Sequence, residues 1–170
     1  EVRLCISFLR LMANLSDSLN LYYLASSHIY KLGLEDLSLC MHFARRHNQS
    51  LHHVFKNIDN IPELKDLSDT THNKIEVMLK DLDKFLEASR SQTTGRLLYS
   101  FLQDTGYLKE LTHSPNQEKE TQIQNIAKFF YLVRDFELVA KDTHVINFIN
   151  YLNLLIEAGD DPATIEADLD

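Results

Sequence analysis

Apolar residues recur at helical spacing through most of the chain, and this pattern restricts its fold more than any other feature. The pattern is clearest between residues 68 and 89, where apolar side chains lie three and four positions apart: Ile75, Met78, Leu79, Leu82, Phe85 and Leu86. Such spacing places one face of a helix against a core. β-branched residues are scattered, and only four Gly and three Pro interrupt 170 residues, which argues against hairpin-rich sheets. We therefore expect an all-α, irregular assembly of about eight to ten helices with no sheet.

Polar stretches with capping residues separate the expected helices. Their approximate ranges are 2–12, 17–25, 34–47, 51–55, 68–89, 96–104, 107–111, 121–141 and 145–158, with a short last helix that begins near Pro162. Ser50 and Thr143 are placed to cap two of these helices, and Gly106 is placed to end another in a left-handed conformation. The apolar surface of the helix at 145–158 is so wide that we expect it at the centre of the molecule. Residues 1–170 are interpreted as a single helical subdomain, with two lobes, 1–66 and 67–170, as an alternative division.

The chain is acidic, and this restricts the partners that it can bind unaided. The formal net charge is −8, from 25 acidic and 17 basic side chains. Because such a surface repels phosphate, strong autonomous nucleic-acid binding is not expected, although a local basic patch can touch DNA when another domain supplies most of the affinity. Cys5 and Cys40 lie on apolar faces, which indicates buried thiols in a reducing compartment. The most apolar stretch, residues 145–156, is too short to span a bilayer, so no membrane partner is expected.

No residue pattern indicates chemistry within the chain. The four glycines are isolated, whereas a phosphate-cradling loop needs clustered glycines and a lysine at fixed spacing. The histidines at positions 42, 47, 52 and 53 lack the spacing of a helical zinc pair and favour a solvated surface loop. No strand-turn-helix elbow presents a serine nucleophile. We expect no catalytic residue, no metal site and no cofactor in these residues.

One basic cluster flanks the helix expected at 34–47 on both sides. It comprises Lys31, Arg45, Arg46, His47, His52, His53 and Lys56. The cluster has two interpretations. It either forms a phosphate-contact surface, or it supplies solubilising charge, with the two arginines favouring the C-terminal end of a helix. The acidic total alone favours the second interpretation.

Several segments, in their order and spacing, resemble one known family. These segments are EVR (1–3), FLRL (8–11), ANLSDS (13–18), LLYSFLQDTGYL (97–108), NIAKFF (125–130), RDFE (134–137) and FINYLNLLIEAGDD (148–161). Together they resemble the 2B subdomain of the UvrD/Rep/PcrA-type superfamily 1 ATP-dependent DNA helicases. The resemblance covers essentially the whole chain.

The resemblance implies a helical insertion in the second RecA-like motor domain of a 3'-5' helicase of DNA repair. In the family this subdomain rotates against the motor and controls unwinding. The parent protein is then expected to be an ATP-binding hydrolase, with ATP and magnesium held by motor domains outside these residues. We expect the chain to be a fragment, because neither end has a cap or a closing element. The expected partners are duplex DNA, the motor domains of the same chain and a regulatory protein, and the expected location is the bacterial cytoplasm, in association with the nucleoid.

The resemblance also points to particular DNA-contact residues. In the family a Gly-Ile-Gly turn opens a helix, where backbone amides can approach phosphate. The matching positions here are Lys31, Leu32 and Gly33, so only the second glycine is present, and we expect Lys31 to supply a charge without reproducing the geometry of glycine. The residues expected to contact DNA are Lys31, Gly33, Arg45, Arg46, His47 and Lys56. The alternative is a protein–protein interaction module of the same parent, without direct DNA contact.

Overall fold

The computed structural model describes residues 1–163, and these residues form helices joined by short connections. Within this range there are nine α-helices, two 3-10 helices and no β-strand, so the predicted all-α fold class is confirmed. The 3-10 helices, η1 (Ile58–Asn60) and η2 (Pro62–Leu64), occupy a stretch that was predicted to be a loop. The α-helices are α1 (Val2–Ala13), α2 (Ser18–Ser26), α3 (Leu34–Arg46), α4 (Leu51–Lys56), α5 (Asp69–Ser89), α6 (Thr94–Asp104), α7 (Tyr107–Thr112), α8 (Gln117–Val139) and α9 (Val145–Glu157).

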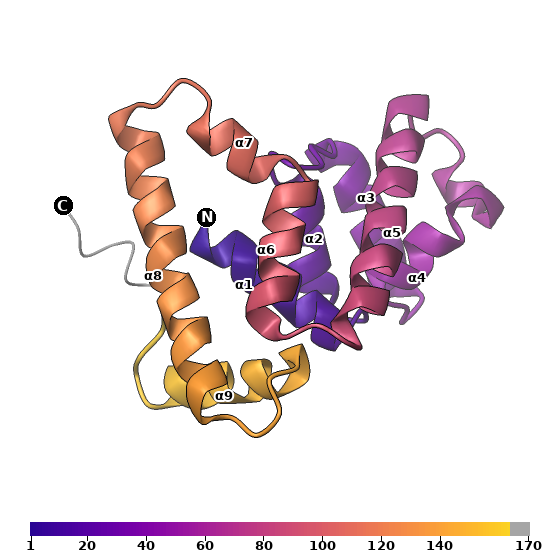
Figure 1. The fold of residues 1–170 in the computed structure, drawn as a ribbon. Helices are drawn as coiled ribbons and strands as arrows, with labels where there is room; N and C mark the ends of the chain where they lie inside the picture. Colours follow the sequence, from indigo (N-terminus) through magenta and orange to yellow (C-terminus); the bar gives the residue numbers. More distant parts are fainter. Residues whose placement is uncertain (164–170) are drawn as a thin grey trace.

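Helix α1 lies at the centre of the molecule. Nine of its 12 residues are buried, and it contacts α2, α5, α6, α8 and α9. Figure 1 shows it with α8 and α9 on one side and α2 to α5 on the other. The Phe8 ring stacks on Phe101 of α6, with 3.9 Å between ring centroids, and meets Phe85 of α5 edge-on at 5.4 Å. Because this aromatic trio joins three helices, the apolar face of α1 organises the core.

The core is continuous across the predicted boundary between residues 66 and 67. Buried side chains from helices on both sides of that boundary belong to one cluster. Cys5 of α1 and Cys40 of α3 are both buried thiols within it. The assignment as one subdomain, and the alternative division into two lobes, stay predictions. None of the helices in residues 1–163 combines the length and the hydrophobicity that a membrane crossing requires.

Side-chain caps determine where several helices begin. Ser50 Oγ accepts from the His53 amide at 3.1 Å, as its position predicted, and Asp17 Oδ1 accepts from the Asn20 amide at 3.1 Å. Helix α8 begins at Gln117, four residues earlier than the apolar pattern indicated. The reason is Asn116, whose Oδ1 accepts from the Lys119 amide at 2.8 Å and adds a polar first turn. Gly106 has a left-handed backbone (φ +78°), as predicted.

Two expectations about α9 are wrong. The helix is not central, because Ile146 and Leu154 on its outer face are 56% and 65% exposed; only the opposite face, with Phe148 and Leu152, is buried. Thr143 does not cap the helix either. Its carbonyl accepts from the amide and hydroxyl of Thr94, at 2.9 and 2.8 Å, and so holds the α8–α9 connection against the start of α6. The short helix expected after Pro162 falls on residues 164–170, outside the described range.

Candidate nucleic-acid interface

The turn that leads into α3 has an unusual backbone conformation at Lys31. The φ of Lys31 is +53°, in the left-handed region that favours glycine. Gly33, which precedes the first residue of α3, has φ −62° and ψ 135°, a conformation open to any residue. A Cβ added at Gly33 meets no atom within 4 Å. A lysine thus adopts the left-handed conformation at position 31, and the glycine at position 33 leaves open space in front of α3.

Helix α5 supports this turn at two neighbouring residues. The Tyr30 hydroxyl donates to Asp81 Oδ2 at 2.9 Å, and the Lys74 ammonium donates to the Lys31 carbonyl. Burial, reinforced by the Asp81 carboxylate, raises the pKa of Tyr30 well above its usual range, so its hydroxyl stays a donor. The turn is therefore held by a helix that lies about 40 residues further along the chain.

A shallow groove runs between the turn and α5. Its lining comes from the connection before α3 and from the first half of α5: Ile29, Tyr30, Lys31, Thr70, Asn73, Lys74 and Val77. Ammonium, amide and hydroxyl groups of this kind contact DNA phosphates. Lys31 and Lys74 bring two positive charges to one place. Thr70, Asn73 and Lys74 were not predicted as part of this surface. They lie on the polar face of α5, and the local sequence pattern does not show which segment packs beside that face.

Acidic residues weaken the N-terminal end of α3 as an anion site. Glu35 and Asp36 lie in its first turn, where their charges offset the positive end of the helix dipole. The Thr71 hydroxyl of α5 donates to Asp36 Oδ2, which fixes this carboxylate beside the helix start. Any attraction for phosphate at the turn therefore comes from the lysines and not from the helix dipole.

The arginines of the predicted cluster lie at the other end of α3. Arg45 and Arg46 are exposed in its last turn, and the His47 ring stacks on Phe43 with 4.1 Å between centroids. Twelve residues separate Gly33 from Arg45 along this helix, a rise of about 18 Å. The structure therefore divides the predicted DNA-contact residues into two groups and does not bring them together in one patch.

Lys56 belongs to neither end of α3. Its ammonium lies 3.5 Å from Asp83 Oδ1 of α5, which offsets much of its charge. His52, on the same short helix, is half-buried, and burial lowers its pKa, with Lys56 acting in the same direction. His53 lies with Nε2 3.4 Å from Asn57 Nδ2. Within residues 1–163 no three His, Cys, Asp or Glu side chains are grouped so as to hold a metal ion.

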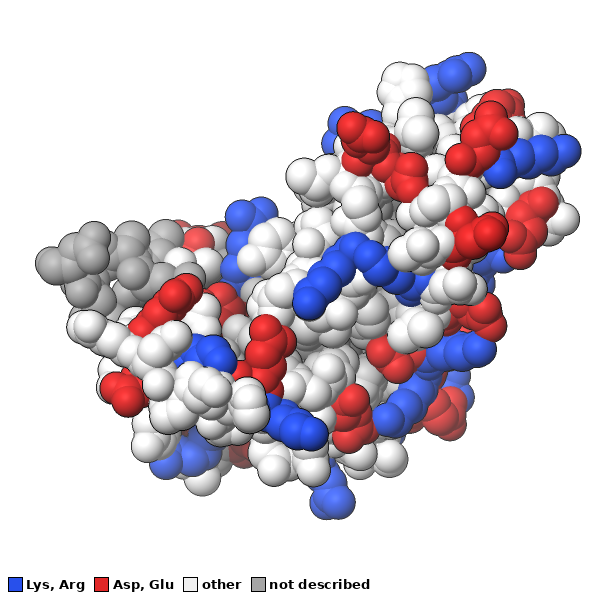
Figure 2. Space-filling model, turned by 90° about the horizontal axis from the view of Figure 1, so that it is seen from above, with Lys and Arg blue, Asp and Glu red and all other residues white. Residues whose placement is uncertain are grey.

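The surface charges are mixed in sign. Figure 2 shows Lys and Arg side chains interspersed with Asp and Glu over one face, without a broad region of positive charge. This agrees with the excess of 25 acidic over 17 basic residues. Phosphate contacts on such a surface are local and few, and they are strongly weakened by salt.

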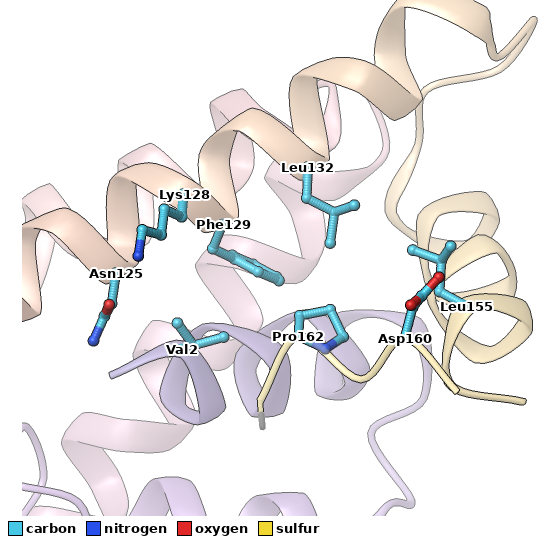
Figure 3. Close-up of a pocket in the computed structure, with 8 residues that line it drawn as sticks. All are labelled: Val2, Asn125, Lys128, Phe129, Leu132, Leu155, Asp160 and Pro162. Atoms are coloured by element: carbon cyan, nitrogen blue, oxygen red, sulfur yellow. The ribbon is translucent and has the colours of Figure 1, made fainter. Parts of the chain in front are cut away.

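A separate apolar cavity lies between α1, α8 and the end of α9. It measures about 220 Å³, less than the roughly 300 Å³ at which small-molecule pockets usually begin. Figure 3 shows Phe129 and Leu132 pointing into it from α8, opposite Val2 and Pro162. Of the polar lining groups, the Asn125 amide already donates to Glu1 Oε1 at 2.8 Å. Lys128 and Asp160 also contribute polar groups to a lining that is mostly apolar.

The thiol of Cys40 is not poised as a nucleophile. Burial raises the pKa of Cys40 to about 12, with the nearby Asp36 charge adding to the effect. A thiol with this pKa stays protonated at neutral pH, whereas catalytic cysteines have lowered values.

Comparison with known proteins reveals distant similarity to DNA helicases. No protein-family profile matches the chain. It is 22% identical over 163 residues to a protein named DNA helicase II from Rickettsia typhi, and the aligned region covers 92% of this chain and 22% of that protein. It is also 22% identical over 162 residues to ATP-dependent DNA helicase PcrA from Staphylococcus epidermidis, covering 92% of this chain and 21% of the relative. The chain thus spans about a fifth of the length of the curated relatives that it matches, and the predicted resemblance is confirmed as a distant one.

Proposed function

We propose, from this distant relationship to UvrD/Rep-type DNA helicases, that the chain is the duplex-facing 2B subdomain of such an enzyme. The observation that carries the proposal is the extent of the match, which takes in 92% of this chain but only about a fifth of each helicase. An all-helical segment without a phosphate-binding loop suits a helical insertion better than a motor domain. The parent is then an ATP-dependent 3'-5' helicase, a cytoplasmic, nucleoid-associated repair enzyme whose ATP and magnesium are bound by its motor domains.

The role of this chain in that enzyme is to meet the duplex and to control unwinding by its orientation against the motor. Lys31 and Lys74 attract backbone phosphates, and the open space at Gly33 lets a phosphate approach the start of α3. Two such contacts give a logarithmic salt dependence with a slope of about −2. Binding by the chain alone is therefore weak, and the motor domains supply the remaining affinity.

The second candidate is a protein–protein interaction module of the same parent. It is favoured by the net charge of −8 and by the two acidic residues in the first turn of α3. Both features oppose phosphate and suit a basic partner surface. In this case a regulatory protein, and not DNA, biases the orientation of the subdomain.

Charge reversal separates the two candidates. We expect Lys31→Glu and Lys74→Glu together to lower duplex affinity at least tenfold at low salt, because the lost attractions become repulsions. The measurement is fluorescence anisotropy with a labelled duplex over a salt series. The matched control reverses two exposed cations elsewhere: Lys109 and Lys141.

The control double variant carries the same change in net charge and should retain more of the affinity than the first. Equal losses in the two double variants would show a response to total charge alone and would contradict the specific interface. Tight binding that ignores salt also contradicts the proposal. Specific capture of a protein by a chain without duplex affinity supports the second candidate.

A further inference from the structure

The backbone at position 31 adopts a conformation suited to glycine, although the residue is lysine. We propose that Lys74 is a positioning residue that holds this turn in its left-handed conformation and so replaces the missing glycine. The effect on the turn stands by itself. Only its consequence for DNA binding rests on the proposed function.

The hydrogen bonds around Lys31 show how the conformation is fixed. Its amide donates to the Ser27 carbonyl at 2.8 Å, and the next amide, that of Leu32, donates to the Ala25 carbonyl at 3.0 Å. These two bonds hold the amide sides of two successive peptides against the end of α2. The Lys31 carbonyl points away from them and accepts from the Lys74 ammonium of α5. The left-handed residue is thus held on both sides, by α2 through its amide and by α5 through its carbonyl.

The position of Lys74 is well defined by its neighbours. Tyr30, the residue before the turn, is bonded to Asp81, which lies seven residues or about two turns further along α5. This second bond keeps the connection against the same face of the helix. An ammonium group that meets a backbone carbonyl forms a charge-assisted hydrogen bond, stronger than a neutral one. Because two bonds join the connection to α5, Lys74 is held close to the Lys31 carbonyl and is suited to position it.

The competing explanation is that Lys74 serves only as a phosphate contact. The two explanations differ in what glycine at position 31 would do. Glycine adopts the left-handed conformation without help, so Lys31→Gly should remove the need for Lys74 in the turn. It would not remove the need for the charge of Lys74 at a phosphate.

The test is a cycle of four chains: the natural sequence, Lys74→Met, Lys31→Gly and the double variant. Hydrogen exchange of the Leu32 amide, measured by NMR without DNA, reports opening of the turn. Loss of one hydrogen bond of this kind should speed exchange about three- to tenfold in Lys74→Met. The double variant should exchange no faster than Lys31→Gly. Lys80→Met is the matched control, because Lys80 pairs with Glu76 on the same helix and does not reach the turn.

A conservative variant keeps the test independent of general damage to α5. Lys74→Arg retains a charged donor and should keep the Leu32 amide protected. Exchange in Lys74→Met equal to that of the natural chain overturns the inference. The inference is also overturned if Lys74→Met speeds exchange of the Leu32 amide equally in chains with lysine and with glycine at position 31. Lys74 would then act independently of the conformation at position 31.

Duplex affinity of the same chains tests the functional consequence. Because the proposed function also makes Lys74 a phosphate contact, Lys74→Met should weaken binding relative to Lys80→Met in both backgrounds, and the loss should be smaller in the Lys31→Gly background. An equal loss in both backgrounds contradicts the positioning role in binding. If no chain binds duplex while the exchange pattern holds, the proposed function fails and the positioning of the turn by Lys74 stands.

Discussion

At the scale of single residues, two glycines that precede helices differ in backbone conformation. Gly33 and Gly106 each precede the first residue of a helix, α3 and α7, and neither would bring an added Cβ within 4 Å of another atom. Only Gly106 has a positive φ, +78°, while Gly33 has an ordinary φ of −62°. The backbone φ therefore does not require glycine at position 33, although glycine is among the residues favoured immediately before a helix.

We predict that Gly106→Ala lowers the free energy of unfolding by about 1–2 kcal/mol, because an alanine is strained in the left-handed region. Gly33→Ala is the matched control, since it changes the same kind of position with a permitted φ. We expect it to cost about 0.5 kcal/mol. Urea denaturation of both variants measures the difference. Equal losses of unfolding free energy in the two variants would show that the positive φ is not the reason for glycine at position 106.

At the scale of elements, α1 determines how the others are arranged. Its ring at position 8 is fully buried and contacts aromatic rings of α5 and α6. Helix α1 also packs against both α2 and α9. Loss of packing on α1 should therefore loosen several helices together.

Phe8→Ala should lower the free energy of unfolding by about 3–5 kcal/mol, because it leaves a large cavity among rings that cannot all close it. Leu138→Ala is a suitable comparison, since this apolar residue is 76% exposed, and its removal should change stability by less than about 0.5 kcal/mol. Chemical denaturation followed by circular dichroism gives both values. A small loss for Phe8→Ala would contradict the central role of α1.

The elements themselves were largely predictable from sequence, and their mutual arrangement was not. Caps such as Asp17 and Ser50 act within three residues, so local pattern reveals them. The start of α8 was missed because a polar first turn carries no apolar signal, although Asn116 marked it. The position of α9 was wrong because a wide apolar surface does not reveal how many faces are covered. The groove beside Lys31 was invisible for a similar reason, since Lys74 lies on a helix 40 residues away.

At the scale of the whole molecule, an acidic chain carries two small basic regions at opposite ends of α3. The sequence could not show that Lys31 and Gly33 lie at one end of α3, apart from Arg45, Arg46 and His47 at the other. The net charge of −8 argues against binding through the general field. Any duplex contact must then be confined to a defined place, and the place we propose is the groove between the turn and α5, which is lined by Lys31 and Lys74.

The most direct measurement of this claim is an NMR titration of the isotopically labelled chain with a short DNA duplex at low salt. Weak binding in fast exchange suits the method, and each backbone amide reports its own surroundings. The account predicts shifts concentrated at residues 31–34 and 70–77, fading as salt is raised, with the amides of α8 and α9 unchanged. Shifts centred on α8 and α9, or no shifts at all at low salt, would contradict the duplex-facing role of this chain.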